Sequence, residues 1–180
     1  MKHVFFFILT LCISYCCIAQ SSGITPAQQK IITAEIEKES TALKQKLSKS
    51  NIDPVLIEFT IDTFRIERYC SKCLKLDYTD YGMRSIAYET ADKYDTLLNK
   101  YYQKLLRVIK GDDKKILIQA QKSWLAFRDN EMKLTETISK DEYSGGGTMQ
   151  RLIDASQYME MIKERTIKIF HHFTRASQVY

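Results

Sequence analysis

The stretch YGMRSIAYETADKYDTLLNKYYQKLLRVI, residues 81–109, decides the fold class of this chain. Its apolar side chains recur at helical spacing and therefore share one stripe. Gly111 follows as a suitable C-terminal stop, because glycine tolerates the left-handed conformation that ends many helices. The stretch predicts a long helix with one buried face. This stripe comprises Met83, Ala87, Tyr94, Leu98, Tyr101, Leu105 and Val108.

Two further helices are predicted before this stretch. Thr25, followed by Pro26 and Gln28, has the pattern of an N-cap, a first helical residue and a capping box. Asp53 and Pro54 begin a second helix by the same logic. The first of these helices is mostly polar, so we expect it to pack loosely. The apolar stripe of the first comprises Ile32, Ile36, Leu43 and Leu47, and that of the second comprises Leu56, Phe59, Ile66, Cys70 and Cys73.

Two more helices are predicted after residues 81–109. Either Asp112 or Asp113 is suited to cap a helix that ends at about residue 139, and Thr148 is suited to cap a last helix. Short connections make successive helices antiparallel neighbours in bundles. Because the Gly-Asp-Asp connection is tight, we expect the helices over 81–109 and 112–139 to form an antiparallel pair and the best-determined part of the fold.

The composition agrees with a helical fold. The 180 residues include only six glycines and two prolines, which argues against sandwiches, barrels and Gly/Pro-rich disorder. With 44% hydrophobic and 27% charged residues, the chain can bury a core. The sequence therefore predicts an all-α fold, a small antiparallel helical bundle of about four to five helices. We divide it into a polar N-terminal helical segment over residues 20–52 and a helical domain over residues 53–180.

Residues 1–19 have the features of a signal peptide. The 15 residues from Val4 to Ile18 carry no charge, and Ala19 precedes a suitable cleavage site. Cleavage would remove one basic residue and no acid, leaving a net charge of +4. A retained anchor and a lipid anchor at Cys16 or Cys17 are less favoured alternatives. We expect an exported chain, periplasmic or secreted, with no transmembrane anchor after cleavage.

Cys70 and Cys73 are the cysteines that remain after this cleavage. Their C-x-x-C spacing lies late in a predicted helix with no strand before it, which is not the position of a thioredoxin-type motif. Disulfides persist outside the cytoplasm. We therefore expect a local disulfide between the two, and the alternative is a pair of half-buried thiols.

Other familiar catalytic patterns are missing from the sequence. His171 and His172 are adjacent, and adjacent helical residues point about 100° apart, so they cannot bind one metal from the same face. The glycines at 145–147 lack the Lys-Ser/Thr and the preceding strand of a P-loop. The basic residues over 100–115 are interpreted as an exposed helix face. We predict no catalytic set, cofactor or metal, and no nucleic-acid partner.

Four ordered motif blocks lie within residues 73–166. They are T-x-x-x-M at 79–83, YD-x-x-LN-x-x-Y-x-x-L at 94–105, AQ-x-x-WL-x-FRD at 120–129 and GGTM at 146–149. In this order, the blocks resemble the N-terminal domain family of LprI-type lysozyme inhibitors. The resemblance implies a small exported helical domain of bacterial envelopes, named after a lipoprotein linked to inhibition of lysozyme. Family members often carry cysteines at positions that align near Ser85 and Met132, so their long-range disulfides are expected to be absent here.

The family blocks place polar residues on two helix faces. Residues three, four or seven apart share a face, so an antiparallel pair would set the two groups opposite each other. Arg128 could then donate to Asp95, with Trp124 covering the pair. Two interpretations stay open: a polar latch that sets helix register, which we prefer, or the floor of a binding groove. The residues concerned are Asp95, Asn99, Tyr102, Gln121, Trp124, Arg128 and Asp129.

These observations favour an envelope binding protein rather than an enzyme. Its ligand or partner stays open: a lysozyme is one candidate and another envelope protein is a second. The alternative is a non-catalytic structural or interaction module of the bacterial envelope, and the oligomeric state stays open as well. We expect residues 140–147 to form the most flexible loop of the chain, and its glycine segment over 144–147, flanked by Lys140, suggests an element that enters an enzyme cleft. Its predicted interaction residues are Gly145, Gly146, Gly147 and Thr148.

Overall fold

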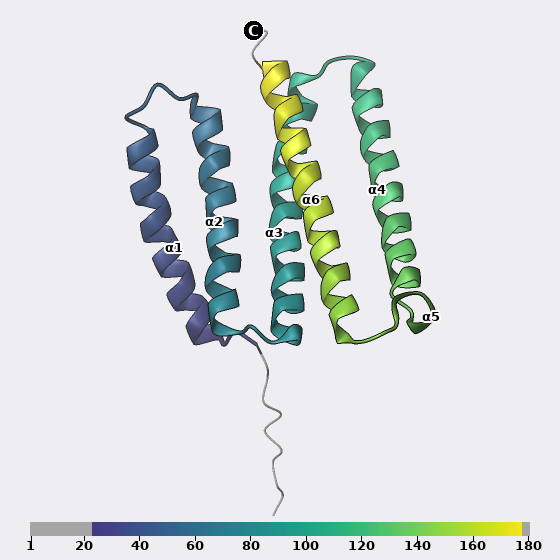
Figure 1. Cartoon of the computed structure of the whole chain (residues 1–180). Helices are drawn as coiled ribbons and strands as arrows, with labels where there is room; N and C mark the ends of the chain where they lie inside the picture. The colour runs from purple at the N-terminus through teal and green to yellow at the C-terminus, as the bar shows by residue number, and fades with distance from the viewer. Residues whose placement is uncertain (1–22, 178–180) are drawn as a thin grey trace, which may run out of the picture.

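The computed structural model describes residues 23–177, and this part of the chain forms an all-α bundle (Figure 1). The proposed signal peptide and Cys16 and Cys17 lie outside the described residues. No helix within 23–177 combines the length and apolarity needed to span a bilayer. The helices are α1 (Pro26–Leu47), α2 (Pro54–Leu76), α3 (Asp80–Val108), α4 (Asp113–Ile138), the one-turn α5 (Asp141–Ser144) and α6 (Thr148–Ser177).

The first two helices begin where the sequence indicated. At α1, the Thr25 hydroxyl accepts from the Gln28 backbone N–H, and the Gln28 side chain accepts from the Thr25 backbone N–H at 2.8 Å. At α2, Asp53 Oδ1 accepts from the Val55 backbone N–H at 2.7 Å. These bonds satisfy backbone donors that have no partner inside the helix. Both predicted starts are confirmed.

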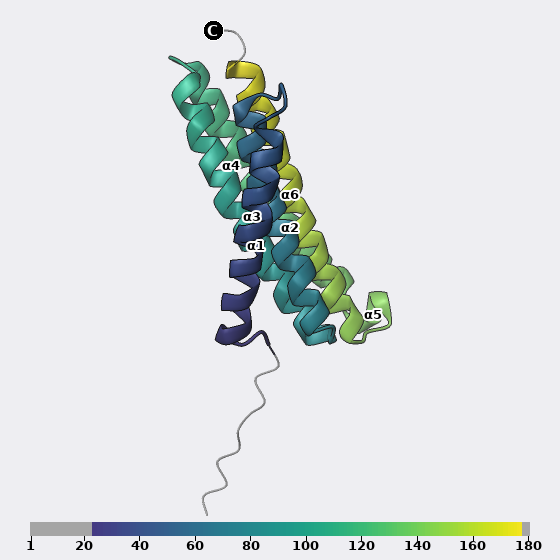
Figure 2. The same ribbon diagram turned by 90° about the vertical axis from the view of Figure 1, so that its left-hand side faces the viewer.

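The order of the long helices across the bundle is α1, α2, α3, α6, α4 (Figure 1). Helix α6 lies between α3 and α4 and runs parallel to α3, so the predicted neighbours α3 and α4 are separated. The expectation that they form the best-determined pair is therefore wrong. Seen from the side of α1, the other long helices lie behind it, and α5 stands at one end (Figure 2).

Small side chains explain why α6 packs on α3. Ala91 of α3 and Ala155 of α6 are fully buried, as are Thr90 and Thr166. Such residues let two helix backbones approach closely. The Thr166 hydroxyl also donates to the Tyr94 carbonyl oxygen at 3.0 Å. Helix α3 buries ten residues and α6 buries six, whereas α4 buries only Leu117.

Aromatic rings form the centre of the core. Phe59 of α2 stacks on Phe170 of α6 with ring centroids 3.8 Å apart. Tyr101 of α3 meets both rings edge-on, at 5.2 and 5.0 Å. Edge-to-face and offset pairs are the favoured arrangements of such rings. The cluster therefore joins α2, α3 and α6 into one packed unit.

Charged side chains hold α1 against α2. Glu39 of α1 accepts from Arg68 at 2.7 Å and contacts Lys72 at 3.0 Å. Arg65 of α2 reaches Glu37, and its Nε donates to the Oγ of buried Ser40 at 3.0 Å. Apolar contact is small, since Ile32 and Ile36 are the buried hydrophobic residues of α1. The polar first helix is therefore docked on α2 largely by ion pairs.

The loop over 140–147, expected to be the most flexible part, is folded. It contains α5, and Gly145, Gly146 and Gly147 adopt φ values of 74°, 76° and 101°, which side chains rarely tolerate. A Cβ at Gly146 would also run into the Asp141 carboxylate. Thr148 is the first residue of α6 rather than its cap, and its hydroxyl donates to Asp80 Oδ2 at 2.9 Å. Thr148 thus links the starts of α6 and α3.

Candidate functional site

The polar residues of the family blocks lie on both sides of α6. On α3, Asn99 Nδ2 donates to Asp95 Oδ2 at 3.0 Å. On α4, the Arg128 guanidinium donates from Nε and Nη2 to Asp129 Oδ1, at 2.9 and 2.6 Å. The expected pairing of Arg128 with Asp95 is therefore not formed. Helix α6 occupies the space across which that bond was predicted.

Arg165 of α6 takes the bridging position instead. Its Nε and Nη2 donate to Gln121 Oε1 of α4, at 3.1 and 2.9 Å. Its guanidinium carbon lies 5.5 Å from the Trp124 ring centroid, and that of Arg128 lies 5.7 Å from the same ring. Trp124 therefore contacts two cations, an arrangement that its electron-rich face favours.

Tyr158 of α6 is a second side chain near the motif residues of both α3 and α4. Burial raises the pKa of its hydroxyl; Arg128 lowers that pKa, while Asp95 raises it further. The phenol therefore lies within charge range of residues on both α3 and α4. Its ring centroid is 6.0 Å from that of Tyr88 on α3.

Sequence reasoning missed Tyr158 and Arg165. A usable signal existed, because Tyr158, Arg165 and His172 recur every seven residues and so fall on one side of α6. That polar side was overlooked beside the stronger apolar stripe of the same helix. We call the three residues the polar stripe of α6.

The motif residues form a half-exposed seam. Asp95, Tyr102, Gln121 and Arg128 are half-buried, and so is Trp124. Asn99 and Asp129 are exposed. None of these side chains is completely buried. The seam joins α4 to α6 through polar and cation–ring contacts, and the choice between a latch and a groove stays a prediction.

The two cysteines are free thiols, so the favoured disulfide is not formed in the structure. Cys73 is fully buried among residues of α1 and α3, whereas Cys70 is half-buried. Both thiols pack at the same apolar cluster, on an unbroken helix. Burial raises the pKa of the Cys73 thiol, which keeps it in the weakly nucleophilic neutral form.

The described residues offer no assembled metal-binding cluster. Within 23–177, no group of three or more His, Cys, Asp or Glu side chains could hold an ion. His171 and His172 are both exposed near the end of α6. The seam instead consists of hydrogen-bonded amides, arginines and aromatic rings, which are side chains typical of packing contacts between helices or proteins.

The fold and the seam define a small all-α domain whose motif residues connect three helices. Residues 70–168 match the family model described as lysozyme inhibitor LprI. The match covers more than half of the chain and includes Tyr158 and Arg165. The chain therefore belongs to the LprI lysozyme inhibitor family. No curated protein and no solved structure matches it.

Proposed function

We propose that this chain is an exported envelope protein that binds and inhibits a lysozyme-class enzyme through the outer side of α4 and α5. The observation that carries the proposal is the exposure of large apolar side chains on α4. Phe127, Leu134 and Ile138 are 54%, 51% and 53% exposed, although the helix is well formed. A row of such side chains along one side of a folded helix is typical of a contact surface for another protein.

Their spacing gives the surface its shape. Phe127, Leu134 and Ile138 lie at i, i+7 and i+11, which places them along one side of the helix. Glu131 falls on the same side, four residues after Phe127. We call these four residues, together with α5, the α4–α5 surface.

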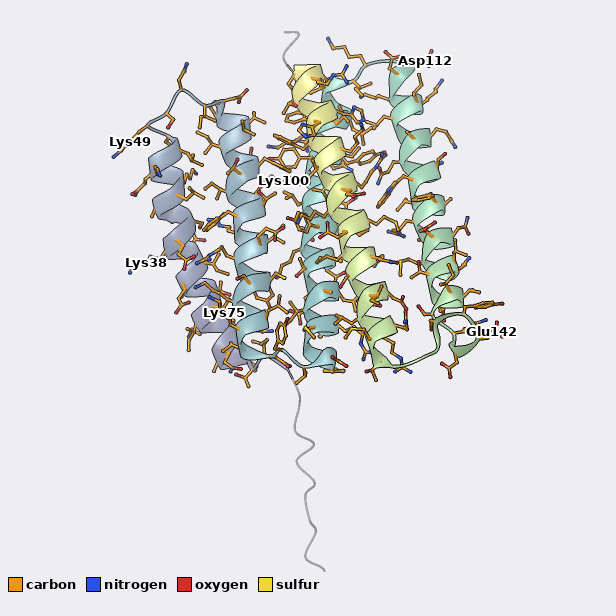
Figure 3. The ribbon with its side chains drawn as sticks, in the orientation of Figure 1. Lys38, Lys49, Lys75, Lys100, Asp112 and Glu142 are labelled. Carbon is orange, nitrogen blue, oxygen red and sulfur yellow. The ribbon has the colours of Figure 1, made fainter. Side chains whose placement is uncertain are left out.

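Charge favours a basic partner for this surface. Besides Glu131, it carries Asp141 and Glu142 in the first turn of α5, and Tyr143 there is 64% exposed. Glu142 lies at the outer corner of the bundle, beside the C-terminal end of α4 (Figure 3). A basic lysozyme would meet local negative charge there, even though the whole chain carries a formal charge of +5.

The test is residual lysozyme activity in the presence of the purified protein and two matched variants. Leu134→Arg places a cation on the α4–α5 surface and should weaken inhibition by at least about tenfold. Ile31→Arg makes the same change at an apolar residue of α1 that is 59% exposed, and should leave inhibition intact. Unchanged inhibition by Leu134→Arg would overturn the surface assignment.

The outcome also separates the two functional classes. Several lysozyme classes, basic and acidic, should be assayed with the protein at tens of micromolar. Inhibition of at least one supports the proposed function. Failure with all of them would instead favour the alternative, a structural or interaction module of the envelope, and the same α4–α5 variants would then be used against other envelope proteins.

A further inference from the structure

A groove opens where the C-terminal ends of α3 and α6 meet the N-terminal half of α4. Its volume is about 550 Å³, within the range of small-molecule sites. Leu117 is the one buried residue of α4, and its neighbour Ile116 is 69% exposed. The groove walls are apolar and comprise Leu105, Ile109, Ile116, Leu117, Ala120 and Ile169.

Cationic groups border this apolar wall. Arg165, His172 and Arg175 of α6 line the groove, and Asp113 of α4 is the acid among its lining residues. Arg165 is half-buried and donates to the neutral Gln121 amide through Nε and Nη2. Within residues 23–177 no carboxylate forms an ion pair with it, and its Nη1 donates no hydrogen bond.

Several other half-buried cations of the bundle form ion pairs with carboxylates. Lys100 contacts Glu58 at 2.8 Å, and Lys163 contacts Glu67 at 2.8 Å. Lys100 lies between α2 and α3 (Figure 3). A buried charge without a counter-charge is costly, so most such groups acquire one. Arg165 differs from these lysines in facing a groove.

The pKa values of Arg165 and His172, two cationic groups in the groove, are shifted in the direction expected where no negative charge lies nearby. Burial lowers the pKa of the Arg165 guanidinium. Partial burial also lowers the pKa of His172, and Lys168, Arg165 and Arg175 lower it further. Positive potential therefore dominates this end of α6, and an anion placed there would relieve it.

We propose that the groove binds a single-chain amphiphile with a carboxylate head, of the fatty-acid class. The chain lies along the apolar wall, and the carboxylate accepts hydrogen bonds from Arg165. One acyl chain matches one apolar wall, and one carboxylate matches the planar guanidinium with its free Nη1 donors. The site lies at the opposite end of α4 from the α4–α5 surface, so either proposal can fail without the other.

Isothermal titration of the purified protein with decanoate, decylammonium and acetate tests the head and the chain separately. Decanoate should bind with a micromolar Kd, decylammonium at least about tenfold more weakly, and acetate not measurably. Trp124, the single tryptophan, should report binding by a fluorescence change because it adjoins Arg165. Equal binding of both amphiphiles, or no decanoate binding at about 1 mM, overturns the proposal.

Three variants locate the site. Arg165→Met should weaken decanoate binding by at least about tenfold, and Ala120→Phe should abolish it by filling the groove from an exposed position. Arg151→Met removes an exposed arginine of α6 outside the groove and should change nothing. Circular dichroism verifies folding, and Ala120→Phe decides the matter if Arg165→Met unfolds. Wild-type affinity in a folded Arg165→Met or Ala120→Phe protein overturns the assignment.

Discussion

Helices α4 and α6 are neighbours with similar amphipathic patterns, yet they are used in opposite ways. Helix α6 buries six residues against α3 and α2, whereas α4 buries Leu117 alone. The difference lies in what faces the neighbour. Helix α6 presents Ala155 and Thr166 to α3, which permit close packing, while α4 contacts α6 through the larger side chains of Gln121 and Trp124. Amphipathicity thus predicts a helix without telling whether its apolar side is buried.

The largest expected effect is on the free energy of unfolding, which should respond differently to substitutions in α6 and in α4. Phe170 of α6 is 3% exposed and stacks on Phe59. Phe170→Ala should cost about 3–5 kcal/mol, because it removes a packed ring and leaves a cavity. Phe127→Ala on α4 deletes an equally large side chain but should cost within about 0.5 kcal/mol. Urea unfolding followed by circular dichroism measures both, and similar losses would mean that α4 is packed as tightly as α6.

The same comparison shows how far the sequence could predict the fold. Local signals were sufficient for the starts of α1 and α2, because Thr25 and Asp53 cap within their own segments. The neighbours of α3 could not be predicted this way. Two successive helices joined by a short loop stay adjacent only if no later helix packs better, and α6 does so through Ala155 and Thr166.

The candidate site shows the same limit. The spacing of Gln121, Trp124 and Arg128 predicts that they share one side of α4, and Arg165 of α6 contacts the first two of them. Their partner was misassigned, because the expected acceptor Asp95 lies on α3 and α6 intervenes. A disulfide between Cys70 and Cys73 was expected because disulfides persist outside the cytoplasm, where an exported chain would reside. In the structure, Cys73 is instead a buried free thiol. Chemistry within one helix is therefore readable from spacing, while chemistry between helices depends on packing order.

Two tyrosines of α3 provide the next test, within the buried region itself. The Tyr94 hydroxyl donates to the Glu67 carboxylate. Burial raises the pKa of Glu67, but hydrogen bonds from Lys163 and Tyr94 lower it by more, so the pKa lies below its ordinary value. The Tyr101 hydroxyl is buried and has no hydrogen-bond partner in the described structure. We expect Tyr94→Phe to cost about 1–3 kcal/mol and Tyr101→Phe to be neutral or slightly stabilising. Equal losses in urea unfolding would show that Tyr101 has a partner.

Energetic coupling should then be found between Gln121 of α4 and Arg165 of α6, and not between Asp95 of α3 and Arg128 of α4. A double-mutant cycle of Gln121→Ala with Arg165→Met should give a coupling of about 1 kcal/mol, because each change removes the other's hydrogen-bond partner. Asp95→Ala with Arg128→Ala should be additive within about 0.5 kcal/mol. A strong Asp95–Arg128 coupling would restore the direct latch and contradict the position of α6.

The smallest effect concerns α1, a peripheral helix held by charge. Arg68 and Lys72 lower the pKa of Glu39 to about 2, from an ordinary value of 4.5. A depressed pKa in the folded state means that this stabilisation is complete above about pH 4.5 and is lost as the pH falls toward 2. Thermal melts at several pH values should show the protein losing stability in that window, and Glu39→Gln should reduce the loss. An identical pH profile in Glu39→Gln would show that the ion pairs of Glu39 with Arg68 and Lys72 contribute nothing to the stability.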